Sequence, residues 1–256
     1  MSVFSSYARY YDLLYKDKDY TAEAKYVRQL LHKYAAQAQS ILELGCGTGI
    51  HATLLAEMGY EICGVDFSSE MLERAKKRAY ELPPQHAEKL QFFHADIRNI
   101  RLNRQFDAVI SLFHVISYQT TNADLQATFA TAKTHLKTGG AFIFDYWYGA
   151  AVLSERPAIR IKRFEDDEIA ITRIAEPVIH VNDNIVDVNY QIFVKNKQTG
   201  AVEELHEVHK MRYLFQPEIK WLATANGFEF ITCREWMSER IPDLKSWGVY
   251  CVCRAL

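Results

Sequence analysis

Short apolar runs and longer amphipathic segments alternate along residues 41–147 of the chain. The apolar runs, which we expect to form buried strands, are residues 41–44, 61–67, 90–96, 106–113 and 141–147. The segments between them that have helical spacing or helix-end residues are residues 51–59, 68–82 and 122–140. Strands that alternate with helices predict βαβ units, and therefore a mostly parallel sheet with helices on both faces.

The pattern changes on either side of this region. Residues 1–38 are expected to be helical, because apolar residues recur with helical spacing between Tyr20 and Tyr34. Within residues 158–215 apolar and polar residues alternate instead, most clearly between Val186 and Val194, and turn-forming residues flank that stretch. This alternation predicts an antiparallel meander of three or four strands. A helix in "PEIKWLATANGF" and two final strands, near 228–234 and 247–254, would then return to the α/β core.

We therefore expect an α/β fold, with a Rossmann-like, mostly parallel seven-stranded sheet, helices on both faces and an inserted antiparallel β-meander. Residues 1–150 would form a ligand-binding core with an N-terminal helical lid, residues 151–215 the insert, and residues 216–256 the return to the core. An antiparallel sheet with one apolar face must bury that face. The insert is therefore predicted to cover a substrate, to pair two copies of the chain in a homodimer, or both.

Composition narrows the possible partners. The chain has 256 residues and a net charge of -2, which argues against a nucleic-acid partner held by bulk electrostatics. There is neither the apolar core of a signal peptide nor an apolar run that could span a membrane, so we expect a cytoplasmic protein without a membrane partner. The cysteines, five in number, are expected to be reduced. Scattered histidines and cysteines make a metal site unlikely on sequence grounds.

The segment "ILELGCGTGI" places glycines at alternate positions, Gly45, Gly47 and Gly49, directly after the first predicted strand. Glycine suits positions where the backbone takes a positive φ or another group comes very close. A Walker A loop would need lysine and then serine or threonine, whereas Gly49 is followed by Ile50. A G-x-G-x-x-G dinucleotide loop would place its third glycine at Ile50 as well. A site for a pyrophosphate group is therefore disfavoured.

The combination of "LELGCGTG", Asp66 at the end of the second strand and Asp96 in "HAD" resembles the S-adenosylmethionine site of class I methyltransferases. The resemblance implies that the glycine loop lies against the methionine portion and the ribose, and that Asp66 accepts hydrogen bonds from the ribose hydroxyls. It also implies that "SLFH" lies beside the sulfonium. The implied cofactor residues are Tyr20, Glu43, Gly45, Cys46, Gly47, Asp66, Phe67, Met71, Asp96, Ile97, Leu112 and Phe113. Each aspartate could instead be a cap or turn residue.

A narrower resemblance concerns the acceptor. "YYDLLYKDKDY", "HEVHKMRYLFQPE" and the insert are similar to the sugar N-methyltransferases of deoxyaminosugar biosynthesis and to related polysaccharide-pathway methyltransferases. This resemblance implies that Tyr11 lies by the reacting amine and that Tyr20 helps to cover the cofactor. The family's active-site histidine aligns with Tyr118, which is better suited to orienting a nucleophile than to acting as a base.

A hydroxyl acceptor would need a base, and His114 or His209 could serve. His114 could instead be a packed strand-end residue, and His209 could face solvent on the insert. "DYWYG", residues 145–149, should wall the acceptor pocket. The tyrosines near the N-terminus are expected to form a lid, with a core-packing helix as the alternative; they are Tyr7, Tyr10, Tyr11 and Tyr15.

These residues predict methyl transfer from S-adenosyl-L-methionine to an amino or hydroxyl group of a small molecule. A nucleotide-activated sugar or a surface-polysaccharide precursor is the expected acceptor. The alternatives are an O-methyltransferase for another small metabolite and a cofactor-binding subunit without catalysis. A nucleic-acid methyltransferase is disfavoured by the near-neutral charge and by "SLFHVISY", which replaces the Asn/Asp-Pro-Pro-Tyr/Phe motif of many such enzymes.

Overall fold

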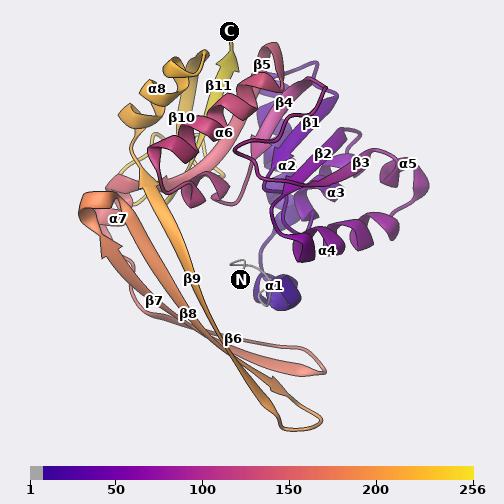
Figure 1. The fold of residues 1–256 in the computed structure, drawn as a ribbon, viewed down its shortest axis with the longest axis vertical. Coiled ribbons are helices and arrows are strands. Elements are labelled where there is room, and N and C mark those ends of the chain that lie inside the picture. Colours follow the sequence, from indigo (N-terminus) through magenta and orange to yellow (C-terminus); the bar gives the residue numbers. More distant parts are fainter. Residues whose placement is uncertain (1–7) are drawn as a thin grey trace.

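The computed structural model describes residues 8–256. Its core sheet has the strand order β3-β2-β1-β4-β5-β11-β10 (Figure 1). The strands are β1 (Ser40–Leu44), β2 (Glu61–Asp66), β3 (Leu90–His94), β4 (Phe106–Ser111), β5 (Leu136–Tyr148), β10 (Phe228–Glu235) and β11 (Gly248–Ala255). The first five in this order pair in parallel, whereas β11 is antiparallel to β5 and β10. The expected Rossmann-like sheet is confirmed.

Helices cover both faces of this sheet because successive strand residues point to opposite sides. Ile41 and Leu42 are neighbours in β1, yet each is fully buried in a different hydrophobic cluster. The cluster around Ile41 includes residues of α2 (Tyr20–Tyr34) and α3 (Ile50–Glu57). The cluster around Leu42 includes residues of α6 (Asn122–Thr134) and α8 (Gln216–Ala225). The sheet is therefore sandwiched between two layers of helices.

The helix boundaries differ from the expectation in two places. The described part of residues 1–38 is largely helical, as expected, but it forms two helices, α1 (Ala8–Leu14) and α2, separated by a turn. Asp19 starts α2 afresh, because its carboxylate accepts a hydrogen bond from the backbone N–H of Ala22 at 2.8 Å. The helix expected over residues 122–140 ends at Thr134, and Gly139–Gly140 lie inside β5.

Packing against the neighbouring strand explains the second difference. A Cβ at Gly140 would lie 2.9 Å from the carbonyl oxygen of Asp107 at the start of β4. Gly140 therefore permits a close approach between strands and does not close a helix.

The α4 helix (Ser69–Tyr80) begins as expected, because Ser68 caps it by accepting a hydrogen bond from Met71 N–H. The short helices α5 (Pro84–Ala87) and α7 (Gly149–Ser154) were not expected.

The insert is an antiparallel meander, as predicted. It consists of β6 (Arg160–Glu165), β7 (Ile169–His180), β8 (Ile185–Asn196) and β9 (Val202–Leu214), each paired antiparallel with the next. Its apolar face is partly covered by α1 and α4, since Ile192 and Val194 of β8 cluster with Tyr10, Leu14 and Met71. In Figure 1, α1 lies in the angle between the core and the extended insert strands.

The insert joins the core sheet where β4 ends. Ser111, the last residue of β4, pairs with Phe144 of β5. Further along β5, the neighbour is the end of β9, which pairs in parallel through Tyr213 with Trp147 and through Leu214 with Tyr148. The insert sheet therefore extends the core sheet beyond the carboxyl end of β4. This junction brings β8 and β9 over the edge of the sheet where parallel α/β folds bind ligands.

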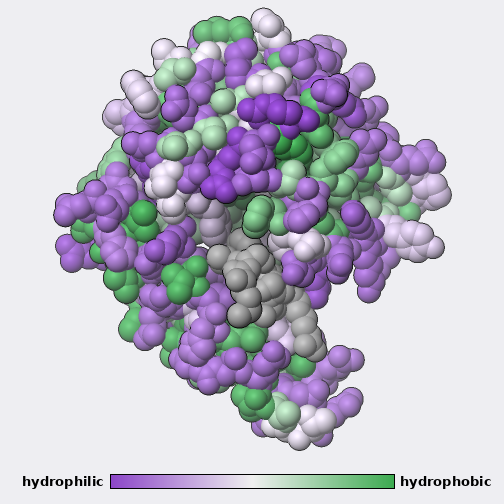
Figure 2. All heavy atoms as spheres, viewed as in Figure 1, coloured by the Kyte–Doolittle hydropathy of each residue, from purple (hydrophilic) through white to green (hydrophobic). Residues whose placement is uncertain are grey.

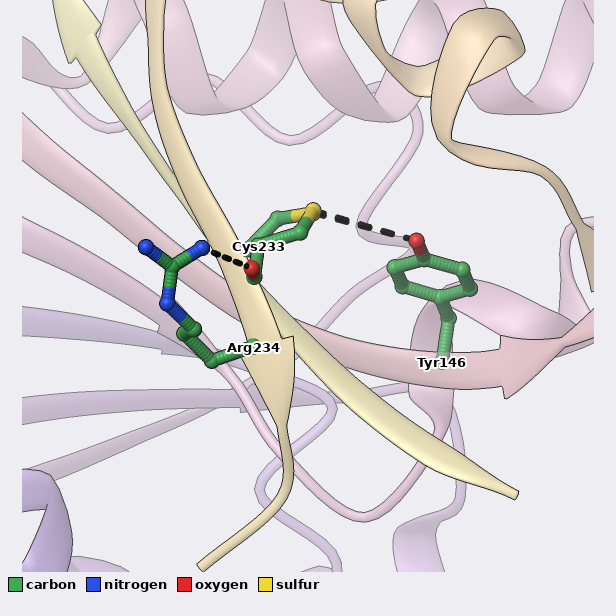
Figure 3. Close-up of a disulfide and its surroundings, with 4 residues drawn as sticks. Tyr146, Cys233 and Arg234 are labelled. Atoms are coloured by element: carbon green, nitrogen blue, oxygen red, sulfur yellow. Dashed lines mark hydrogen bonds between the residues drawn. A yellow bond between two sulfur atoms is a disulfide. The ribbon is translucent and has the colours of Figure 1, made fainter. Parts of the chain in front are cut away.

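The expectation that all the cysteines are reduced is wrong for two of them. Cys233 of β10 and Cys251 of β11 are directly opposite one another, with Cα atoms 4.2 Å apart, and form a disulfide (Figure 3). Cys233 Sγ also lies 3.8 Å from the hydroxyl of Tyr146. The remaining cysteines, Cys46, Cys63 and Cys253, are free and buried. Strand register, which the sequence does not reveal, brings the two partners together.

No helix within residues 8–256 is both long and apolar enough to cross a membrane.

Candidate active site

A cavity of about 580 Å³ opens at the carboxyl ends of β1, β2 and β4, with α1 and the insert also contributing to its wall. Every residue expected at the cofactor site lines it, namely Tyr20, Glu43, Gly45, Cys46, Gly47, Asp66, Phe67, Met71, Asp96, Ile97, Leu112 and Phe113. The residues expected near the acceptor line it too, namely Tyr11, His114, Tyr118 and His209. We call these two groups the cofactor half and the acceptor half. The structure brings them together, and their individual roles stay predictions.

The glycine loop needs its glycines for conformation and for space. Gly45, Gly47 and Gly49 have φ values of 79°, 54° and 73°, which residues with a Cβ rarely adopt. A Cβ at Gly45 would lie 2.6 Å from both γ carbons of Val115. The N–H groups of Gly45 and Cys46 donate to the carbonyl of Val65 at 2.8 and 3.0 Å. These bonds fasten the loop to β2.

Asp66 is held at the end of β2 by backbone donors. One carboxylate oxygen accepts from Gly47 N–H at 2.7 Å, and the other accepts from Ser68 N–H at 2.9 Å. Burial raises the pKa of Asp66 above its ordinary value despite these hydrogen bonds. Each carboxylate oxygen has a second lone pair. Asp66 can therefore accept further hydrogen bonds from hydroxyl groups in the cavity, as the predicted ribose contact requires.

Glu43 provides the test of whether a cationic cofactor fits. Its side chain is buried, and its Oε2 atom has no hydrogen-bond partner among the residues that the structure describes. Burial, with a smaller contribution from the charge of Asp66, raises the pKa of Glu43 to about 8. An isolated buried carboxylate is costly, so an ammonium group in the cavity would stabilise its ionised form. S-adenosylmethionine carries such a group, and the glycine loop and Asp66 suit the rest of it.

Asp96 has a partner that the sequence analysis missed. Both of its carboxylate oxygens accept hydrogen bonds from the guanidinium of Arg98, the shortest at 2.6 Å. Arg98 also donates to Asp124 of α6 at 2.8 Å. These hydrogen bonds keep the pKa of Asp96 below its ordinary value. The proximity of Arg98 in sequence was the available signal, because a residue two positions after a strand-end acid can fold back onto it.

The loop after β4 carries backbone strain at the centre of the cavity. Phe113 and His114 both have φ of 63°, in the left-handed region that such residues seldom occupy. Buried Asp145 holds this conformation by accepting from the backbone N–H of His114 at 3.0 Å, and its other oxygen lies 2.8 Å from Nδ1 of the same residue. Strain of this kind clusters at ligand sites. His114 is thus a strand-end residue that also faces the cavity.

The acceptor half contains a hydrogen-bonded chain that the sequence did not predict. Tyr118, at the end of the 3₁₀ turn η1 (Val115–Tyr118), has its Oη atom 2.8 Å from Nδ1 of His209. Nε2 of His209 lies 3.0 Å from the carboxylate of Glu207, and the two side chains are only 4% and 9% exposed. The alternative that His209 faces solvent is therefore wrong. The insert folds back over the cavity at the β5–β9 junction.

The N-terminal tyrosines divide between the two expected roles. Tyr10 is buried in a hydrophobic cluster and its hydroxyl donates to Glu203 at 3.0 Å, so it packs α1 against the insert. Tyr11 and Tyr15 line the cavity, and Tyr15 meets Phe113 edge-on with ring centroids 5.1 Å apart. Tyr7 lies outside the described residues. Further lining residues not singled out from the sequence are Thr48, His51, Val115, Gln119, Tyr190 and Met211. Trp147 of the expected wall also lines the cavity.

The sequence is similar to those of known methyltransferases, which agrees with the cofactor site inferred from the cavity. Residues 41–140 match the model of a methyltransferase domain family. The chain is 29% identical over 225 residues to dTDP-3-amino-3,4,6-trideoxy-alpha-D-glucopyranose N,N-dimethyltransferase of Streptomyces venezuelae, covering 86% of this chain and 89% of that protein. It is 27% identical over 245 residues to the putative methyltransferase YqeM of Bacillus subtilis, covering 95% and 94%.

Solved structures of methyltransferases have the same fold as this chain. Streptomyces venezuelae DesVI superposes with a TM-score of 0.81 at 25% identity over 98% of both chains. The sugar N-methyltransferase KedS8 from Streptoalloteichus has the same fold, with a TM-score of 0.78 at 23% identity over 96% of this chain and 93% of that one.

The match over residues 41–140 and these relatives identify an S-adenosylmethionine-dependent methyltransferase, and the fold is that of the class I enzymes. Within that class it resembles the sugar N-methyltransferases, as the tyrosine-rich start and the insert suggested from the sequence.

Proposed function

We propose that this enzyme methylates the amino group of a nucleotide-activated amino sugar. The observation that carries the proposal is the single cavity, which joins the cofactor half to an aromatic acceptor half. The similarity to a dTDP-amino-sugar N,N-dimethyltransferase over most of both chains supports the same acceptor class. Aromatic side chains such as Trp147 and Tyr190 suit the apolar faces of a sugar ring.

An amine acceptor matches the chemistry that the cavity offers. S-adenosylmethionine, when bound, supplies an already activated methyl group. The acceptor nitrogen must be neutral and held in line, so positioning can account for much of the rate enhancement. The hydroxyls of Tyr11 and Tyr118 provide hydrogen bonds for that positioning. Of the two histidines expected in the acceptor half, His209 is hydrogen-bonded to Tyr118, whereas His114 pairs with Asp145.

The test is methyl transfer to paired acceptors. The purified chain is incubated with S-adenosylmethionine and either a dTDP-amino-deoxysugar or the dTDP-sugar with a hydroxyl group at the same position. We expect the amino sugar alone to gain one or two methyl groups by mass spectrometry. Equal methylation of the hydroxyl sugar would favour the O-methyltransferase alternative. Tight cofactor binding with no turnover on any acceptor of either kind would favour the non-catalytic subunit.

We also propose that the insert pairs two copies of the chain and that the enzyme works in the cytoplasm. Apolar side chains remain exposed on the insert strands, among them Ile161, Val178 and Val208. Figure 2 shows hydrophobic residues interspersed with hydrophilic ones over this part of the surface. Light scattering should give twice the chain mass, and Ile161→Lys together with Val178→Lys should return it to the monomer.

A further inference from the structure

A line of hydrogen bonds leads from the cavity into the buried side of the insert. Tyr118 and His209 line the cavity, and Glu207 stands behind them on β9. The distances are 2.8 Å from Tyr118 Oη to His209 Nδ1, and 3.0 Å from His209 Nε2 to Glu207 Oε2. All three groups can carry or receive a proton, and each adjacent pair is within hydrogen-bonding distance.

The order of donors follows from the chemistry of the three side chains. A carboxylate only accepts, so Glu207 fixes the proton of neutral His209 on Nε2. Nδ1 then carries a lone pair, and Tyr118 must donate its hydroxyl hydrogen to it. The oxygen of Tyr118 consequently acts as an acceptor toward the cavity. A group in the cavity that donates a hydrogen bond, such as an ammonium or amine, is the matching ligand.

Neighbouring side chains shield these three hydrogen-bonded residues from solvent. Tyr190 of β8 packs edge-on against the His209 ring, with centroids 4.9 Å apart. The Arg173 guanidinium of β7 lies 4.9 Å from the Tyr190 ring and 5.6 Å from the Tyr15 ring of α1. Burial raises the pKa of Tyr118 well above its ordinary value. Tyr118 therefore does not ionise by itself and can only pass a proton on.

We propose that Tyr118, His209 and Glu207 form a proton relay that removes a proton from the acceptor nitrogen. The relay rests on the proposed function, because an ammonium nitrogen has no lone pair and must be deprotonated before it can accept a methyl group. Each methyl transfer leaves a new ammonium, so a second transfer to the same nitrogen needs the relay again. Tyr118 is the catalytic residue of the three, while His209 and Glu207 are positioning residues that act through it.

The step is balanced within these groups. The N–H bond of the acceptor ammonium breaks and its proton moves to Tyr118 Oη. The original Oη–H bond of Tyr118 breaks at the same time, and that proton moves to Nδ1 of His209. The products are a neutral amine, a neutral Tyr118 and an imidazolium that donates both to Tyr118 and to the Glu207 carboxylate. The pairing with Glu207 stabilises this imidazolium.

The same strand offers a matched control. His206 and Glu204 also form a histidine–glutamate pair, with Nε2 and Oε1 2.9 Å apart. This pair is exposed on the opposite face of β9, and neither residue lines the cavity. His206→Gln therefore makes the same chemical change as His209→Gln on the same strand without touching the relay.

The first test does not depend on any acceptor. Imidazole ¹⁵N spectra of the ligand-free chain, recorded over a range of pH, should show that the neutral form of His209 is protonated on Nε2. The His209→Gln variant identifies the signal, and Tyr118→Phe should shift its Nδ1 resonance, whereas His206→Gln should leave it unchanged. A neutral form of His209 that is protonated on Nδ1 would overturn the relay.

The second test uses the pH dependence of turnover with a dTDP-amino sugar. At pH 7 we expect kcat to fall by about 100-fold in His209→Gln and by a smaller factor in Glu207→Gln, with KM nearly unchanged. The kcat of His209→Gln should recover about tenfold for each added pH unit, because solvent then deprotonates the amine. Adding Tyr118→Phe to His209→Gln should cost little more, since both act in one relay.

The outcomes separate the relay from the proposed function. A purely structural role for His209 predicts a loss of kcat that alkaline pH does not restore, and that result would overturn the relay. If the wild-type chain methylates hydroxyl sugars and no amino sugar, the proposed function fails and the relay to a nitrogen fails with it, while the imidazole spectra still decide the order of hydrogen-bond donors from Tyr118 to Glu207. His206→Gln should keep wild-type kcat throughout; an equal loss in that variant would contradict the assignment to the buried pair.

Discussion

The cofactor half and the acceptor half of the cavity face each other but are assembled in different ways. Apart from Tyr20 of α2 and Met71 of α4, the cofactor half comes from strand ends and loops between residues 43 and 113, and backbone hydrogen bonds such as those to Asp66 fasten it locally. The acceptor half draws on α1, η1 and the insert, and side chains far apart in sequence hold it together. Cofactor binding should therefore withstand changes that abolish acceptor chemistry, whereas the reverse should not hold.

The largest expected effect is that of Gly45→Ala. The substitution places a Cβ 2.6 Å from Val115 at a residue with φ of 79°, so strain and overlap add. We expect the free energy of unfolding to fall by about 2–4 kcal/mol and S-adenosylhomocysteine binding to be lost. Thermal unfolding and calorimetric titration measure the two effects.

Gly200→Ala is the control for Gly45→Ala. Gly200 also has a positive φ, of 73°, but a Cβ there would meet nothing within 4 Å. It should lose only about 1–2 kcal/mol and bind the cofactor normally. Equal losses in the two variants would show that conformation alone, and not the close approach to Val115, explains the glycine.

Tyr11→Phe should impair the reaction of the acceptor while leaving cofactor binding intact. We propose that the Tyr11 hydroxyl hydrogen-bonds the acceptor, so its removal should lower kcat by about 10–100-fold. The dissociation constant of S-adenosylhomocysteine should change little, because the ring that lines the cavity remains. Tyr80→Phe, on an exposed residue of α4, serves as the control for activity. A large loss of cofactor affinity in Tyr11→Phe would contradict the division into halves.

Phe67→Ala should have a smaller effect confined to the cofactor half. The Phe67 ring is 62% exposed at the rim of the cavity, which suits an aromatic surface that stacks on a bound base. Losing that contact should raise the dissociation constant about 5–10-fold while kcat at saturation stays unchanged. Trp221→Ala removes a similarly exposed ring from α8, which does not line the cavity, and should change neither quantity.

The effect expected at Glu43 is confined to the pH dependence of stability. Its pKa is raised to about 8 in the folded protein from 4.5, so the folded chain keeps a proton that the unfolded chain releases. Stability from this group is therefore fully present below about pH 4.5 and is lost as pH rises toward 8.

Glu43→Gln should remove the loss of stability that Glu43 causes as pH rises. Melting temperatures of the ligand-free variant and wild type, measured from pH 5 to 9, should diverge toward alkaline pH. The variant should be more stable there by roughly 2–4 °C for each kcal/mol. Parallel curves would mean that the pKa of Glu43 is not raised in the folded protein.

The cofactor half was predictable because its residues lie at fixed places in a local pattern. A strand followed by spaced glycines, and then by acids at the next strand ends, is visible in one dimension. Backbone geometry bears this out at Gly45, whose positive φ is what the spacing suggested. The Asp96–Arg98 pair escaped prediction because a charged side chain can turn either to a ligand or to a neighbour.

The acceptor half was less predictable because register and strand junctions decide it. His209 could face solvent or the cavity, and only the pairing of β9 with the end of β5 places it inside. The sequence does not predict a role for Glu207, since a carboxylate on an alternating strand usually points outward. The disulfide between Cys233 and Cys251 depends on register in the same way.

The most direct test of the account is calorimetric titration of S-adenosylhomocysteine into wild type and Asp66→Ala. Glu61→Ala is the control, because it removes an exposed carboxylate from the opposite end of the same strand. We predict tight binding to wild type and to Glu61→Ala, and a loss of at least about 100-fold in Asp66→Ala, as expected when hydrogen bonds to a buried charged group are removed. Absence of binding to the wild type, or equal binding to all three, would contradict the assignment of this cavity to the cofactor.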